Sequence, residues 1–189
     1  MKKRTVFIFL MSIIVITFSI ATFFLNNKVV MLSSNIKKGI EKYWGNKVVI
    51  KEVKDFEAYG KKFRLVLSTP VNNEKYKYFN CYEEKFNGFY YKSYQASEQG
   101  GSKALINSSI VSFNIGKGSD KENAFTVVYG CNKGLLVDNY EMKISKNEKN
   151  IISSITGKEY FIDAYKGFFE GPVSASGKDG SDMLEAICD

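Results

Sequence analysis

The residues able to do chemistry in this 189-residue chain are three cysteines and a set of carboxylates, because the sequence contains no histidine. Every mechanism and metal site that needs an imidazole is thereby excluded. A cysteine nucleophile would lack its usual base, and no Cys-x-x-Cys spacing supports a redox role. The acidic stretch at 179–185 is typical of a plain β-turn rather than a calcium loop. We therefore assign no catalytic residue, no metal site and no cofactor.

The cysteines are Cys81, Cys131 and Cys188. Cys81 and Cys131 lie in or beside predicted strands, whereas Cys188 is next to last, at a terminus that tends to fray. In an oxidising compartment we expect any disulfide to join Cys81 to Cys131, where it closes a long loop and contributes on the order of 4 kcal/mol. The alternative is three unpaired thiols.

The carboxylates show no local acid/base pairing. Glu83 and Glu84 are adjacent on a predicted strand, so their side chains point to opposite faces. Asp55 and Glu57 face the same side, but they stand beside lysines and are typical of a solvated surface. The segment 34–37 spells Ser-x-x-Lys, yet the partner motifs of that hydrolase signature are missing from the sequence. A His-free hydrolase, built from distant residues, stays the alternative function.

An aromatic and basic hairpin is the most distinctive stretch of the chain. Asn87-Gly88 is a strong turn signal between two predicted strands. The aromatic residues around it are Tyr76, Tyr78, Phe79, Tyr82, Phe86, Phe89, Tyr90, Tyr91 and Tyr94. One face of the hairpin must be core, and the other could form a binding platform, for which Tyr90, Tyr91 and Lys92 are the candidate residues. The alternative is ordinary cross-strand pairs beside solvated lysines.

The elements that must position these residues are mostly strands. From Lys47 onward apolar residues alternate, as in Phe63, Leu65 and Leu67, and turn residues recur at short intervals. Many short strands at about 8–12-residue spacing predict a mainly β domain over 47–189, a sandwich or a barrel-like arrangement of antiparallel sheets.

A short amphipathic helix is predicted ahead of the β domain, over 26–46. Its apolar stripe consists of Val29, Leu32, Ile36, Ile40 and Tyr43. These spacings fit one face of a helix, and Gly45-Asn46 marks its end. The stripe either packs on the domain's own sheet or contacts lipid or a partner helix beside a membrane.

The N-terminal 25 residues differ from the rest of the chain. The basic tail 1–4 precedes 5–25, a run of 21 residues without charge, which would form a helix about 31 Å long. We interpret this run as a transmembrane signal-anchor, and a cleaved signal peptide is the alternative. The basic tail favours a cytoplasmic N-terminus and an extracytoplasmic β domain, which would be secreted if the segment is cleaved.

The layout resembles small signal-anchored exported proteins of low-GC Gram-positive bacteria, a group without an assigned activity. The resemblance is carried by 1–25, by the strand 125–130 and by the turn Gly177-Lys178-Asp179-Gly180. It implies a location and a style of fold, and it transfers no site residue. We expect a non-enzymatic binding or interaction module at the cell envelope. Its partners would be the membrane and an envelope component (an anionic wall polymer, a glycan or a protein), and not nucleic acid.

Overall fold

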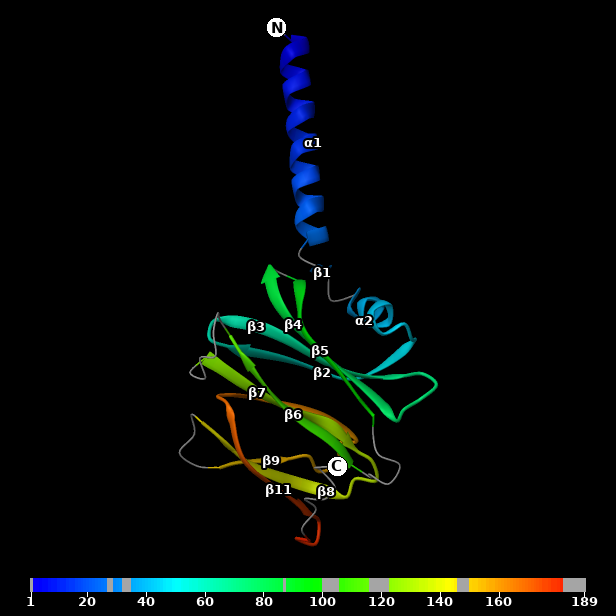
Figure 1. The fold of residues 1–189 in the computed structure, drawn as a ribbon, viewed down its shortest axis with the longest axis vertical. Helices are drawn as coiled ribbons and strands as arrows, with labels where there is room; N and C mark the ends of the chain where they lie inside the picture. Colours follow the sequence, from blue (N-terminus) through cyan, green and yellow to red (C-terminus); the bar gives the residue numbers. More distant parts are fainter. Residues whose placement is uncertain are drawn as a thin grey trace.

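The strands stack as three antiparallel sheets, with a long helix at the N-terminus (Figure 1). The computed structural model describes residues 2–26, 29–31, 35–86, 88–99, 106–115, 123–145 and 150–181. The elements are α1 Lys2–Asn26, β1 Val29–Met31, α2 Ile36–Trp44, β2 Val48–Ala58, β3 Lys61–Pro70, β4 Tyr76–Phe86, β5 Phe89–Gln99, β6 Ile106–Asn114, β7 Ala124–Asn132, β8 Val137–Ile144, β9 Ile151–Ser154, β10 Tyr160–Lys166 and β11 Phe169–Gly177. The mainly β, antiparallel prediction is confirmed.

The three sheets are named here by their strand order. Sheet A has the order β1-β5-β4-β3-β2, sheet B the order β10-β7-β6, and sheet C the order β11-β8-β9. Sheet A lies nearest to α1 and sheet C farthest from it, with sheet B between them (Figure 1). The edge strands β2 of sheet A and β10 of sheet B run beside each other, so these two sheets also meet along one side.

One apolar core fills the space between sheets A and B. The alternating residues Phe63, Leu65 and Leu67 of β3 all face it, as their spacing predicts. From β4, Phe79 stacks on Tyr129 of β7 with ring centroids 4.2 Å apart. Side chains from both sheets interdigitate here, which is how two twisted sheets exclude water between them.

A second core lies between sheets B and C. Val128 of β7 and Phe161 of β10 pack against Tyr140 and Met142 of β8. Because β7 contributes to both cores, every residue from Ala124 to Asn132 is buried. Alternate side chains of β7 thus point to opposite sheets, and both faces of the strand are covered, as expected for the central layer of a stack.

The outer face of sheet A carries the helix α2. Ile36 and Ile40 are buried against Val48, Val66 and Tyr78, so the apolar stripe packs on the domain's own sheet. The helix ends where the sequence predicts, because Gly45 adopts the left-handed conformation (φ 70°) and its N–H donates to Glu41 O at 2.9 Å.

The prediction of one helix over 26–46 is wrong in its first half. Val29–Met31 forms β1, which pairs with Tyr91, Tyr90 and Phe89 of β5, and Leu32 lies outside the described residues. A short run of β-branched residues can satisfy either period, and here the unpaired edge of β5 provides the partner.

The uncharged run 5–25 is helical, within α1. Across the part of the chain that the structure describes, however, no helix is both long enough and apolar enough to qualify as a membrane span.

Candidate functional site

A groove of about 380 Å³ opens on the outer face of sheet A. Four charged side chains line it, Asp55, Glu57, Lys62 and Glu84, together with Tyr90 and parts of Phe56 and Phe63. The strand register explains this gathering, since Asp55 lies opposite Arg64, Glu57 opposite Lys62, and Glu84 opposite Tyr90. Side chains alternate along a strand, so Phe63 and Leu65 of β3 point toward the core. The polar neighbours Lys62 and Arg64 therefore lie on the outer face.

Arg64 holds two of the residues that line the groove, Asp55 and Tyr90. Its Nε and Nη2 donate to the two carboxylate oxygens of Asp55, each at 2.7 Å, in the bidentate geometry that suits a guanidinium. Its guanidinium carbon also lies 4.8 Å from the centre of the Tyr90 ring. The hydrogen bonds from Arg64 lower the pKa of Asp55, and burial raises the pKa of Tyr90. At neutral pH these residues are therefore a neutralised ion pair and an uncharged phenol.

The remaining charges of the groove are more acidic than basic. Glu84 Oε1 accepts a hydrogen bond from the Gly88 N–H at 2.9 Å, which ties it to the β4–β5 turn. Glu57 and Lys62 stand opposite each other on β2 and β3. With Asp55 neutralised by Arg64, two carboxylates face one lysine. Such a lining can accept hydrogen bonds from hydroxyl or ammonium groups, and it repels phosphate or carboxylate ligands.

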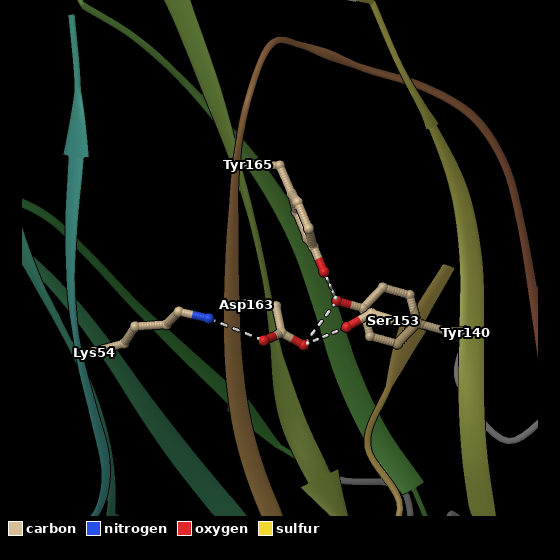
Figure 2. Close-up of polar contacts among 5 residues, drawn as sticks. All are labelled: Lys54, Tyr140, Ser153, Asp163 and Tyr165. Carbon is tan, nitrogen blue, oxygen red and sulfur yellow. Dashed lines mark hydrogen bonds and ion pairs between the residues drawn. The ribbon is translucent and has the colours of Figure 1, made fainter. Parts of the chain in front are cut away.

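A second polar constellation is buried where the three sheets meet (Figure 2). Asp163 of β10 has a side chain only 9% exposed, and its Oδ1 lies 3.0 Å from Nζ of Lys54 on β2. Its Oδ2 accepts hydrogen bonds from Tyr140 Oη at 2.9 Å and from Ser153 Oγ at 3.1 Å. The hydroxyls of Tyr140 and Tyr165 are 2.8 Å apart. One carboxylate thus joins sheets A, B and C.

The chemistry of this buried network is that of a structural tie. Burial, with the negative charge of Asp163 beside it, raises the pKa of Tyr140, and burial also raises the pKa of Tyr165. Both phenols therefore stay protonated and serve as hydrogen-bond donors or acceptors. A buried carboxylate with an ammonium and two hydroxyls is fully satisfied, and its donors come from three different strands.

The predicted binding residues Tyr90, Tyr91 and Lys92 do not form one exposed platform. Tyr90 is 6% exposed and belongs to the apolar cluster beneath α2. Tyr91 is half-buried, with Lys85 Nζ 6.0 Å from its ring centre, and Lys92 Nζ lies 3.8 Å from the ring centre of Tyr43. Most of the hairpin rings whose side chains are described are core or half-buried, which agrees with the cross-strand interpretation.

The predicted disulfide between Cys81 and Cys131 is not formed in the structure, because both residues are buried free thiols. Burial raises the pKa of both thiols, so neither is a reactive thiolate. Cys188 lies outside the described residues.

Sequence reasoning missed Arg64 and Asp163. Asp163 had a detectable signal, since it interrupts the apolar strand Tyr160–Lys166, and a carboxylate in such a strand requires buried partners. Its partner Lys54 is 109 positions away, and nothing local points to it. Asp55 and Glu57 were considered as a surface pair, and the structure places them on the groove.

Among the residues that the structure describes, no group of three or more His, Cys, Asp or Glu side chains is arranged to hold a metal ion. Comparison with protein-family models, with curated proteins and with solved structures gives no match.

Proposed function

We propose that this chain is a membrane-attached, non-enzymatic binding module whose β domain stands on the outer side of the membrane. The attachment is supported by α1, along which large apolar side chains are exposed: Val6, Phe7, Ile8, Phe9, Leu10, Met11, Ile13, Ile14, Val15, Ile16, Phe18 and Ile20. An apolar surface of this extent on a single helix needs a covering that water does not provide.

The polar residues of α1 fit the same environment. Ser12 Oγ donates to Ile8 O at 2.9 Å, Thr17 Oγ1 to Ile13 O at 2.7 Å, and Ser19 Oγ to Val15 O at 2.8 Å. Each hydroxyl is thus satisfied within the helix, as a lipid environment demands. Lys2, Lys3 and Arg4 at its start favour an inward-facing N-terminus. If α1 were removed by cleavage, the β domain would be secreted.

The observation that carries the binding function is the groove on sheet A. Its volume of about 380 Å³ is within the range of small-ligand sites. Its lining of carboxylates, one lysine and a tyrosine suits a ligand rich in hydroxyl groups and without negative charge. Among the envelope components expected from the sequence, this favours a glycan over an anionic wall polymer.

The test uses the full chain in detergent micelles and measures binding by calorimetry. Neutral oligosaccharides of two to four sugars should bind, and a poly(glycerol phosphate) should not. The double variant Glu57→Gln/Glu84→Gln should bind the oligosaccharide at least tenfold more weakly, because two strong acceptors are lost. Glu170→Gln, which changes a carboxylate on sheet C, is the matched control. Equal affinity in both variants, or preference for the anionic polymer, would contradict the proposed groove ligand.

The hydrolase alternative is favoured by one observation, the three carboxylates around a single groove. Against it, Asp55 is held by Arg64 with a lowered pKa, whereas a general acid needs a raised one. Incubation of the same oligosaccharides with the full chain decides between the two functions. If shorter sugars are released by the unmodified chain and not by the Glu57→Gln variant, catalysis would be established.

The topology has its own test. Protease added to intact cells should remove the β domain, and protection of the domain would contradict an outward orientation.

A further inference from the structure

The helix α2 lies close to the point where the chain leaves α1. α1 ends at Asn26 and β1 begins at Val29, so the two elements are at most about 11 Å apart. β1 pairs with the edge of β5, and α2 lies beside β1 (Figure 1). If α1 enters a membrane, as proposed above, α2 is held near the surface of that membrane.

The apolar face of α2 is already occupied. Ile36 and Ile40 are buried in the cluster on sheet A, and Trp44 stacks on Tyr78 with ring centroids 4.5 Å apart and planes 5° from parallel. Ile36 and Ile40 therefore have no surface left to offer to lipid chains. What α2 presents outward is its other face.

That other face is basic and is named here the α2 basic face: Lys37, Lys38 and Lys42, with Lys47 shortly after the end of the helix, all exposed. The nearby carboxylate is Glu41, which accepts a hydrogen bond from Val48 N–H at 3.2 Å and lies 3.6 Å from Lys47 Nζ. Tyr43 is 53% exposed on the same helix, and Lys92 lies over its ring. The face carries an excess of positive charge around a half-exposed aromatic ring.

We propose that the α2 basic face lies on the bilayer surface and binds anionic lipid headgroups. This inference rests on the proposed membrane attachment. Clustered lysines beside a membrane helix match the negative potential of anionic lipids, and a tyrosine suits the depth of the headgroups. The long lysine side chains reach phosphate groups without moving the helix from its place on sheet A. The contact fixes the tilt of the β domain over the membrane.

The first experiment is a lysine-acetylation footprint of the full chain reconstituted in vesicles. The vesicles consist of phosphatidylcholine alone or of phosphatidylcholine with about one-third phosphatidylglycerol. Lys37, Lys38 and Lys42 should be acetylated at least threefold more slowly in the anionic vesicles, and 1 M salt should remove the difference. Lys143 on β8 and Lys158 in the turn between β9 and β10 lie outside α2, and as internal controls they should react equally in both vesicles. Equal rates for all five lysines in both vesicles would overturn the inference.

A second experiment uses Trp44, the single tryptophan of the chain, as a reporter. Phosphatidylcholine with a nitroxide on its headgroup should quench its fluorescence more strongly when phosphatidylglycerol is present. The triple variant Lys37→Gln/Lys38→Gln/Lys42→Gln should lose this gain, and Lys143→Gln/Lys158→Gln should keep it. A gain that survives in the triple variant would overturn the role of these lysines.

A carbonate wash of the vesicles separates this inference from its premise. If the chain stays with the vesicles but its lysine acetylation rates do not depend on lipid composition, the attachment by α1 stands and the α2 contact is overturned. A chain that washes off overturns both.

Discussion

Two aspartate–cation pairs of this domain have similar distances, but their carboxylates differ in exposure. Asp163 lies 3.0 Å from Lys54 with a side chain 9% exposed, and Asp55 lies 2.7 Å from Arg64 with a side chain 64% exposed. The first pair sits where three sheets meet and recruits two hydroxyls (Figure 2). In the second pair, Asp55 lines the open groove.

The difference shows that distance alone does not tell what an ion pair does. In the first pair, Asp163 has lost most of its water whereas the Lys54 side chain is still 37% exposed, so removal of the cation leaves a carboxylate unpaired in a medium of low polarity. In the exposed pair, water and salt replace a lost partner at little cost. We therefore assign the Asp163 pair to stability and the Asp55 pair to the shape and charge of the groove.

The largest expected effect comes from Asp163→Ala. This change leaves Lys54, Tyr140 and Ser153 without their common acceptor and should lower the free energy of unfolding by about 3 kcal/mol. Urea titration of the full chain in micelles, followed by circular dichroism, measures it. Asp163→Asn keeps one acceptor oxygen and should cost less. A loss below about 1 kcal/mol for the alanine variant would mean that the network is not a structural tie.

A pair of double-mutant cycles compares the two ion pairs directly. The coupling energy between Lys54 and Asp163, from Lys54→Met, Asp163→Asn and their combination, should be about 2 kcal/mol. The coupling between Arg64 and Asp55, from Arg64→Met, Asp55→Asn and their combination, should stay below about 1 kcal/mol. Coupling energies of equal size would remove the distinction between the two regions.

Tyr140→Phe tests the hydroxyl part of the buried network. The change removes one donor to Asp163 and the link to Tyr165 while keeping the ring, and should cost about 1–2 kcal/mol in unfolding free energy. Tyr43→Phe, on the exposed side of α2, is the matched control and should be neutral. If both variants unfold at the same denaturant concentration as the unmodified chain, the phenol contributes only its packing.

The smallest effect is expected at Asp55. Its pKa is lowered from 3.8 in the folded chain by hydrogen bonds from Arg64, so its contribution to stability is present above that value and is lost as the pH falls through the lower folded pKa. Asp55→Asn should therefore change the unfolding free energy by less than about 1 kcal/mol at pH 7. The difference from the unmodified chain should shrink further below pH 3.8. A difference that grows toward acid pH would contradict the assigned sign.

The fold class was within reach of the sequence, because alternation and turn signals are local. Phe63, Leu65 and Leu67 alternate and are all buried, and Gly88 (φ 79°) sits in the β4–β5 turn as the Asn-Gly signal indicates. The three-layer stack was not, since the near-continuous apolar run at 124–131 fits a strand covered on both faces but does not say which sheet covers the second face. That depends on where sheet C docks.

The candidate site was predicted less well, for a related reason. Tyr90 was expected on an exposed platform, but α2 returns to the same face and buries it. The groove residues come from β2, β3, β4 and β5, and only the strand register brings Glu84 beside Tyr90 and Asp55 beside Arg64. Pairings between strands are set by hairpin geometry and bulges, and a one-residue shift would have placed different side chains there.

The strand order also determines how the nascent chain can assemble. Sheet A is complete by Gln99 and draws on one continuous stretch of sequence, so it can form while the remainder is still being synthesised. Until β7 arrives, its inner face leaves Phe63, Leu65, Leu67 and Phe79 uncovered. β10 then joins β7 only after β8 and β9 have been made between them in the sequence. The last strands, β10 and β11, complete sheets B and C, and a chain interrupted before Ala124 would carry a sheet A whose apolar inner face has nothing to cover it.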